Sequence, residues 1–176
     1  MNTKYALITG ATAGIGLDIA KELASQGNNI ILTARREDRL QEISIFLREE
    51  FNIQCDYVVA DLAQSSAPEK IFNFCLDNNY VVEILINNAG YSINKKFHET
   101  GEDEEEKFLR VLGIAVVALT KKFIPSMLEQ RHGKIMMVSS LAAFAPPSSG
   151  WGLSLIHISE PTRQEAISYA VFCLKK

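Results

Sequence analysis

Three glycines lie close together near the N-terminus, between an apolar run and a helical pattern. Residues 9–16 read TGATAGIG, and the preceding residues 5–9 form a short apolar run. A strand that enters a glycine-rich turn and then a helix presents backbone N–H groups to an anion such as a diphosphate. A tight turn that serves only close helix-to-strand packing is the alternative, because a glycine loop alone is a weak signal.

Polar segments follow three later apolar runs. Asp61-Leu62, Asn87-Asn88-Ala89-Gly90 and Ser139-Ser140 each stand where a strand is expected to end. In parallel sheets, ligands bind beyond the carboxyl ends of the strands. The three segments and the glycine loop are therefore expected at one edge of a sheet, where they could form one site.

The elements that must position these segments alternate between strand and helix. A first helix after the glycine loop and the strand at residues 30–33 complete a βαβ unit, which implies a parallel sheet. The expected strands cover residues 5–9, 30–33, 56–60, 82–86 and 134–139, and the expected helices cover 15–24, 38–51, a segment after Pro68, and 102 towards 131. This pattern predicts an α/β fold with a doubly wound parallel sheet, truncated after the fifth strand.

Two features of the long helix can be anticipated. The acidic residues 102–106 are expected to open it, since negative charge is favoured at a helix N-terminus. The apolar run at 111–119 has about half of the roughly 20 residues that a membrane-spanning helix needs, so we expect it to be buried in protein.

The four motifs together, TGxxxGIG, DL, NNAG and VSS, resemble the short-chain dehydrogenase/reductase family over residues 1–152. The resemblance implies a Rossmann fold that binds NAD(P) and an oxidoreductase that transfers hydride between the nicotinamide and an alcohol or ketone. Ser140 matches the serine that orients the substrate, and it is the one catalytic residue assigned. The implied cofactor residues are Gly10, Thr12, Gly14, Ile15 and Gly16 in the glycine loop, Asp61 and Leu62 beside the adenine, and Asn87, Ala89 and Gly90 beside the nicotinamide half.

Two arginines follow the second strand, where an NAD-selective site carries an acidic residue for the ribose 2′-hydroxyl. Arg35 and Arg36 favour a 2′-phosphate instead, so NADP is the expected cofactor and NAD remains possible. A solvated start to the next helix is the other interpretation of either arginine.

Two departures from the family pattern bear on activity. The family's water-ordering asparagine falls on Leu112, and the nearest upstream asparagine, Asn94, belongs to the preceding loop. No Tyr-x-x-x-Lys follows Ser140, since Tyr169 is followed four residues later by Cys173. We therefore expect no dehydrogenase turnover from this chain, and a non-catalytic nucleotide-binding or interaction module is the rival hypothesis.

The C-terminal residues do not continue the family pattern. Residues 153–163, LSLIHISEPTR, match an in-frame translation of a transposase-type sequencing adapter, and residues 167–174, ISYAVFCL, match the adapter's far end. We therefore expect an incomplete NAD(P)-binding domain at 1–152 and a non-native tail at 153–176. Such a tail is not expected to contribute to the native fold. A natural divergent C-terminus that forms a strand or helix is the alternative.

Composition limits the partners. The 176 residues carry 18 Lys+Arg against 21 Asp+Glu, a formal charge of −3, which disfavours nucleic-acid binding. The three cysteines lack disulfide or zinc spacing, and no secretory signal or membrane span is evident, so we expect reduced, mostly buried thiols, no bound metal, no membrane partner and a cytoplasmic location. The expected partner is a small alcohol or carbonyl substrate, and the family resemblance implies a homo-oligomer of the intact protein formed through the long helix.

Overall fold

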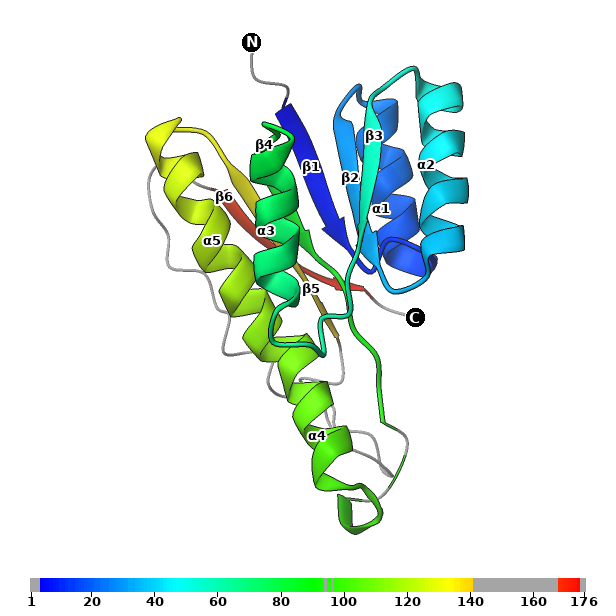
Figure 1. Ribbon diagram of the computed structural model, residues 1–176, viewed down its shortest axis with the longest axis vertical. Coiled ribbons are helices and arrows are strands. Elements are labelled where there is room, and N and C mark those ends of the chain that lie inside the picture. The colour runs from blue at the N-terminus through cyan, green and yellow to red at the C-terminus, as the bar shows by residue number, and fades with distance from the viewer. Residues whose placement is uncertain (1–3, 94, 96, 141–167, 175–176) are drawn as a thin grey trace.

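The computed structural model describes residues 4–93, 95, 97–140 and 168–174, and it has the predicted alternation of strands and helices (Figure 1). The elements match the expected ranges to within a few residues at each end. In chain order they are β1 (Lys4–Thr9), α1 (Gly14–Ser25), β2 (Asn29–Ala34), α2 (Glu37–Phe51), β3 (Cys55–Val59), α3 (Ala67–Asp77), β4 (Val81–Asn87), η1 (Phe97–Glu99), α4 (Glu102–Leu109), η2 (Arg110–Ile114), α5 (Ala115–Glu129), β5 (Lys134–Ser140) and β6 (Ser168–Leu174).

The sheet is parallel throughout, and its strands lie in the order β3-β2-β1-β4-β5-β6. The predicted doubly wound sheet with five strands is confirmed. The chain moves from β1 outward to β3 and then returns across β1 to β4, so the order reverses between β1 and β4. Ligands of such sheets bind outside the carboxyl ends of the strands at this reversal.

A sixth strand, β6, extends the sheet beyond the five that were predicted. It pairs with β5 from Lys134↔Ser168 to Ser140↔Leu174. Its sequence, SYAVFCL, is rich in aromatic and β-branched residues, which favour a strand at an open sheet edge. The strand lies within residues 153–176, the segment that does not continue the family pattern.

Both faces of the sheet are apolar, as a sheet covered by helices on both sides requires. Leu7 of β1 belongs to the core under α3 and α5, whereas its neighbour Ile8 belongs to the core under α1 and α2. Figure 1 shows these two helix layers on opposite sides of the sheet. The alternation fixes the strand register, since a shift by one residue would exchange the two faces.

The long helix differs from the prediction in two ways. Its acidic opening is as expected, because α4 begins at Glu102 with four acidic residues in its first turn. However, a π-helical segment, η2, separates α4 from α5. The apolar run is also buried on only one face: Leu112 and Leu119 are buried, whereas Ile114 and Val117 are 53% and 52% exposed.

The expectation that this apolar run is buried in protein is therefore confirmed for its inner face and wrong for its outer face. By length and composition alone, the helix over Glu102–Glu129 is long and apolar enough to cross a membrane, the single such helix among the described residues. Its inner face packs on the sheet, as that of a core helix does, through Leu119, Phe123 and Met127.

Candidate functional site

The glycine loop forms a sharp turn between β1 and α1. Gly10 and Gly14 have φ values of +67° and +53°, in the left-handed region that favours glycine. Gly10 N–H donates to the Thr33 carbonyl of β2 at 2.9 Å, which fixes the loop to the neighbouring strand. A Cβ added at Gly14 would meet nothing within 4 Å.

The N-terminus of α1 opens into this space. The first turn of α1 contains no acidic residue. Its N-cap residue is Ala13, which makes no side-chain hydrogen bond to the first N–H groups of the helix. The first backbone N–H groups of a helix have no intrahelical acceptor, and the helix dipole favours negative charge beside them. Ile15, 42% exposed, is the apolar side chain next to these groups. The turn can therefore receive an anionic group.

Gly16 serves a different purpose, because it allows the loop to contact the turn after β4. A Cβ at Gly16 would lie 2.3 Å from Asn88 Nδ2 and 2.5 Å from the Gly10 carbonyl oxygen. A Cβ at Gly10 would lie 2.8 Å from Ala89 Cα. Both contacts are shorter than a side chain permits, so glycine is required sterically at these two positions.

Hydrogen bonds join the end of β1 to the turn after β4. Thr9 Oγ1 accepts from the N–H groups of Asn88 at 2.9 Å and Ala89 at 3.0 Å, and it donates to the Ile86 carbonyl at 3.2 Å. Asn88 Nδ2 donates to the carbonyls of Thr9 at 2.9 Å and Gly10 at 3.2 Å. Asn88 was not among the predicted site residues, although the second asparagine of NNAG was the available signal.

The other residues of NNAG face different parts of the molecule. Asn87 is 5% exposed, and its Nδ2 donates to Thr120 Oγ1 of α5 at 3.3 Å. Gly90 is exposed at the sheet edge and lies against the long helix, since a Cβ there would meet Leu112 Cδ2 at 3.0 Å. The structure thus brings Ala89 and Gly90 to the glycine loop and the long helix, and it ties Asn87 to α5.

The predicted residues on the β2 and β3 side also lie at the carboxyl edge of the sheet. Arg36 Nη2 donates to the buried Thr12 Oγ1 at 3.2 Å, which links the end of β2 to the glycine loop. Arg35 is exposed. Asp61 Oδ1 accepts from Ala63 N–H at 3.0 Å, and its neighbour Leu62 is buried. Arg36 therefore contacts the glycine loop, whereas Arg35 and Asp61 follow β2 and β3 at the same edge of the sheet.

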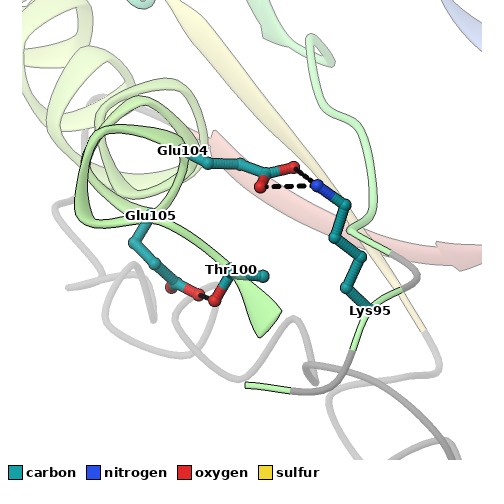
Figure 2. A network of polar contacts seen from close by, with 4 residues as sticks. All are labelled: Lys95, Thr100, Glu104 and Glu105. Atoms are coloured by element: carbon teal, nitrogen blue, oxygen red, sulfur yellow. Dashed lines mark hydrogen bonds and ion pairs between the residues drawn. The ribbon is translucent and has the colours of Figure 1, made fainter. Parts of the chain in front are cut away.

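The segment after NNAG is fastened to α4 (Figure 2). Lys95 Nζ contacts both carboxylate oxygens of Glu104, at 3.0 and 2.8 Å, and Thr100 Oγ1 donates to Glu105 Oε1. The Tyr91 ring meets the buried Phe108 ring edge-on, with centroids 5.5 Å apart. Polar contacts and an aromatic contact thus connect the described residues of this loop to α4.

Leu112 lies where the family count places the asparagine. It is in the π-helical segment, 7% exposed, and beside Gly90. Its apolar side chain cannot hold a water by hydrogen bonding. Ser140 ends β5 at the same carboxyl edge, and its side chain lies outside the described residues, as does Asn94.

Cys55 and Cys75 are free and buried, as expected for reduced thiols. Burial raises the pKa of each thiol to about 12. Such thiols remain protonated near neutral pH and are poor nucleophiles. Among the described residues, no group of three or more His, Cys, Asp or Glu side chains is placed to hold a metal ion.

Comparison with known proteins places this geometry in a family. A fatty acyl-CoA reductase of Acinetobacter baylyi is 32% identical over 144 residues, which are 81% of this chain and 48% of the reductase. L-Sorbose reductase of Gluconobacter frateurii, solved with NADPH and L-sorbose, has a TM-score of 0.84 and 29% identity, covering 90% of this chain and 62% of that chain.

A metagenomic short-chain oxidoreductase solved with NADP has a TM-score of 0.87 and 26% identity, covering 99% of this chain and 83% of that chain. The chain spans about half the length of the curated relatives that it matches, from 44% to 60%. The profile of the short chain dehydrogenase family matches residues 4–151. The chain therefore belongs to the short chain dehydrogenase family.

Proposed function

We propose that the carboxyl edge of this sheet binds a nicotinamide dinucleotide, with NADP preferred over NAD. The observation that carries the proposal is the glycine cradle, where Gly14 leaves open space in front of the α1 N-terminus. A diphosphate fits there because it needs close backbone approach and N–H donors. The similar structures solved with NADPH and NADP support the same cofactor.

Different residues bind different parts of the dinucleotide in this proposal. The loop residues Gly10, Gly14, Ile15 and Gly16 hold the diphosphate, Asp61 and Leu62 flank the adenine, and Asn87, Ala89 and Gly90 line the nicotinamide half. When bound, the cofactor supplies hydride exchange with a carbinol or carbonyl carbon. The protein's part is to orient the dinucleotide and exclude water around it.

The preference for NADP rests on the end of β2. Arg36 is held towards the glycine loop by Thr12, and Arg35 and Arg36 occupy the end of β2, where NAD-selective sites carry an acidic residue. A guanidinium binds phosphate oxygens through charge-assisted hydrogen bonds, typically worth about 1.5–3 kcal/mol. Thr12 is thus a positioning residue for the arginine that meets the 2′-phosphate.

Turnover is not expected from this chain. Ser140 orients the substrate oxygen in this proposal, but no Tyr-x-x-x-Lys follows it, and Leu112 replaces the asparagine that orders water. Tyr91 and Lys95 have the same four-residue spacing, yet Lys95 is engaged by Glu104. Burial also raises the pKa of Tyr91, whereas an acid/base tyrosine needs a lowered pKa.

Binding of NADPH and NADH to the purified chain tests the cofactor proposal. Fluorescence titration should give a lower Kd for NADPH than for NADH. Arg36→Ala should raise the Kd of NADPH by about 10- to 150-fold and leave the Kd of NADH within about twofold of its original value. Arg39→Ala, at an exposed ion pair within α2, is the matched control. Equal affinity for both dinucleotides in the native chain would overturn the preference for NADP.

A steady-state assay with NADPH and a small ketone tests the second part. We expect binding without NADPH oxidation. Measurable carbonyl reduction that copurifies with the chain would contradict the conclusion that the chain lacks the catalytic tyrosine and lysine. The rival hypothesis, a non-catalytic nucleotide-binding or interaction module, is favoured by Leu112, and a Tyr-x-x-x-Lys after the Ser140 region in an uninterrupted coding sequence would reject it.

We also propose that the intact protein self-associates through the outer face of the long helix. Ile114 and Val117 expose apolar side chains there, which suits contact with the same face of a second copy. Sedimentation of the native chain should reveal a dimer that Val117→Glu converts to monomer. A monomer at all concentrations would contradict this proposal.

A further inference from the structure

Leu112 has no part in cofactor binding in the site described above, although it lies beside a residue that does. It is 7% exposed and belongs to the core under α3 and α5. A Cβ added at Gly90 would lie 3.0 Å from Leu112 Cδ2. That distance is shorter than an ordinary van der Waals contact, so the leucine fills the space that a side chain at position 90 would need. Leu112 therefore packs directly on the backbone of the NNAG turn.

The turn that Leu112 packs on also contacts the glycine loop. A Cβ at Gly10 would lie 2.8 Å from Ala89 Cα, so the two backbones are in close contact. Thr9 Oγ1 accepts from Ala89 N–H at 3.0 Å, and Ala89 packs against the core that contains Leu112. Ala89 and Gly90 therefore lie between the long helix on one side and the glycine loop on the other.

Two further contacts fix the direction of this segment along the long helix. Asn87 Nδ2 donates to Thr120 Oγ1 at 3.3 Å. The Tyr91 ring meets the Phe108 ring edge-on, with centroids 5.5 Å apart. Residue numbers rise along the segment and fall along the helix, so the two run in opposite directions. Leu112 makes the contact between these two ends.

The helix departs from α-helical geometry at this contact. The segment Arg110–Ile114 is π-helical, and Val111 and Leu112 are both 7% exposed although they are adjacent in sequence. The wider π-helical turn reduces the angle between consecutive side chains, so both can face the core. Such single turns within α-helices are frequent at functional sites. Here the π-helical turn is the part of the long helix that meets Gly90.

We propose that Leu112 positions Ala89 and Gly90 for the nicotinamide half of the cofactor, by packing behind Gly90 and holding the turn against the glycine loop. The inference rests on the proposed NADP site, in which these two residues line the nicotinamide half. Leu112 is a positioning residue, because it acts through Gly90. An apolar side chain suits this task, since a methyl group packed on backbone needs no hydrogen bond.

Titration of the full 176-residue chain with NADPH and with adenosine 2′,5′-bisphosphate tests this role, because the second ligand lacks the nicotinamide half. Substitutions that act through packed neighbours change binding by about 2- to 30-fold. We expect Leu112→Ala to raise the Kd of NADPH by a factor in this range and to leave the Kd of adenosine 2′,5′-bisphosphate within about twofold. Leu112→Met, which conserves the volume, should keep both Kd values within about twofold of those of the native chain.

Met127→Ala is the matched control. Met127 is 0% exposed on the core side of the same helix, and its neighbour is Gly133 before β5, where a Cβ would lie 2.6 Å from Met127 Cβ. Its truncation also leaves a cavity in the core, so it should lower the urea midpoint of unfolding as Leu112→Ala does. It should leave the Kd of both ligands within about twofold. If Leu112→Ala does not fold, Leu112→Val provides the same comparison with a smaller cavity.

Circular dichroism of each variant verifies that it is folded. Unchanged NADPH binding in the folded Leu112 variant overturns the positioning role and leaves a residue that only stabilises the core. Equal weakening of both ligands, or equal weakening of NADPH by Met127→Ala, overturns it as well, because the effect would then not be specific to the nicotinamide half. If the native chain binds neither ligand, the proposed function itself fails, a result distinct from equal binding by the native chain and the variant.

Discussion

Replacing Gly16 by alanine should break the contact between the glycine loop and the turn after β4. The new Cβ would lie 2.3 Å from Asn88 Nδ2 and 2.5 Å from the Gly10 carbonyl oxygen. The Asn88 side chain can rotate away, but it then loses its hydrogen bonds to the Thr9 and Gly10 carbonyls. The Gly10 oxygen is backbone and can move only if the whole turn shifts.

The cost can be worked out from these contacts. Overpacking costs about 1–3 kcal/mol, and each lost hydrogen bond costs about 0.5–1.5 kcal/mol. Alanine recovers up to about 1 kcal/mol through its helix propensity, since Gly16 lies within α1. The expected decrease in the free energy of unfolding is therefore about 3 kcal/mol.

Gly14→Ala is the matched control, because it lies two residues away in the same turn. A Cβ there meets nothing within 4 Å, and the cost is the left-handed backbone at φ +53°. The left-handed strain destabilises the folded state, and the lower entropy of the unfolded alanine variant offsets part of that loss. The net cost is about 1 kcal/mol. Gly16→Ala should therefore be the more destabilising of the two by about 2 kcal/mol.

Urea unfolding followed by circular dichroism measures both variants. The same Gly16→Ala change made together with Asn88→Ala should cost less than it does alone, since one clash and both hydrogen bonds are already absent. If Gly16→Ala were as stable as Gly14→Ala, or if its cost were unchanged without the Asn88 amide, the steric account of the loop would be refuted.

Three further predictions concern stability. Thr9→Val leaves two amide N–H groups of the β4 turn without their acceptor and should cost about 2–4 kcal/mol in urea unfolding, whereas Thr9→Ser should cost less than 1 kcal/mol. Burial raises the pKa values of the Cys55 and Cys75 thiols from 9.0 to about 12, so their contribution to stability is fully present below pH 9 and is lost as the thiols ionise at higher pH. The urea midpoint of unfolding should therefore fall between about pH 9 and 12, and it should fall less steeply in Cys55→Ala. Glu104→Gln should change stability by less than about 1 kcal/mol, because the carboxylate and Lys95 are 37% and 50% exposed; a larger loss would mean that this ion pair fixes the loop energetically.

The sheet was predictable because its signals are local. Apolar runs of four to six residues, separated by helical patterns, predicted a doubly wound parallel sheet, and TGATAGIG marked the turn after β1. Positions 10 and 14 have positive φ values, which favour glycine, and a glycine-rich sequence pattern can anticipate such a turn. The reason for Gly16 is a contact with Asn88, some seventy residues later, and no local pattern contains it.

Other features depend on tertiary packing. Ile114 and Val117 look like core residues in sequence, yet the sheet covers only the opposite face of their helix. The π-helical segment around Leu112 has no signature in the periodicity of the helix.

Amide NMR of the isotopically labelled chain, titrated with NADPH, tests the central claim most directly. The claim is that the cofactor occupies the carboxyl edge of the sheet at the reversal between β1 and β4. The predicted result is saturable shift changes at Gly10, Gly14, Gly16, Ala89 and Gly90, with the amides at the amino ends of the strands unchanged. No saturable change, or changes confined to the outer face of α5, would contradict it.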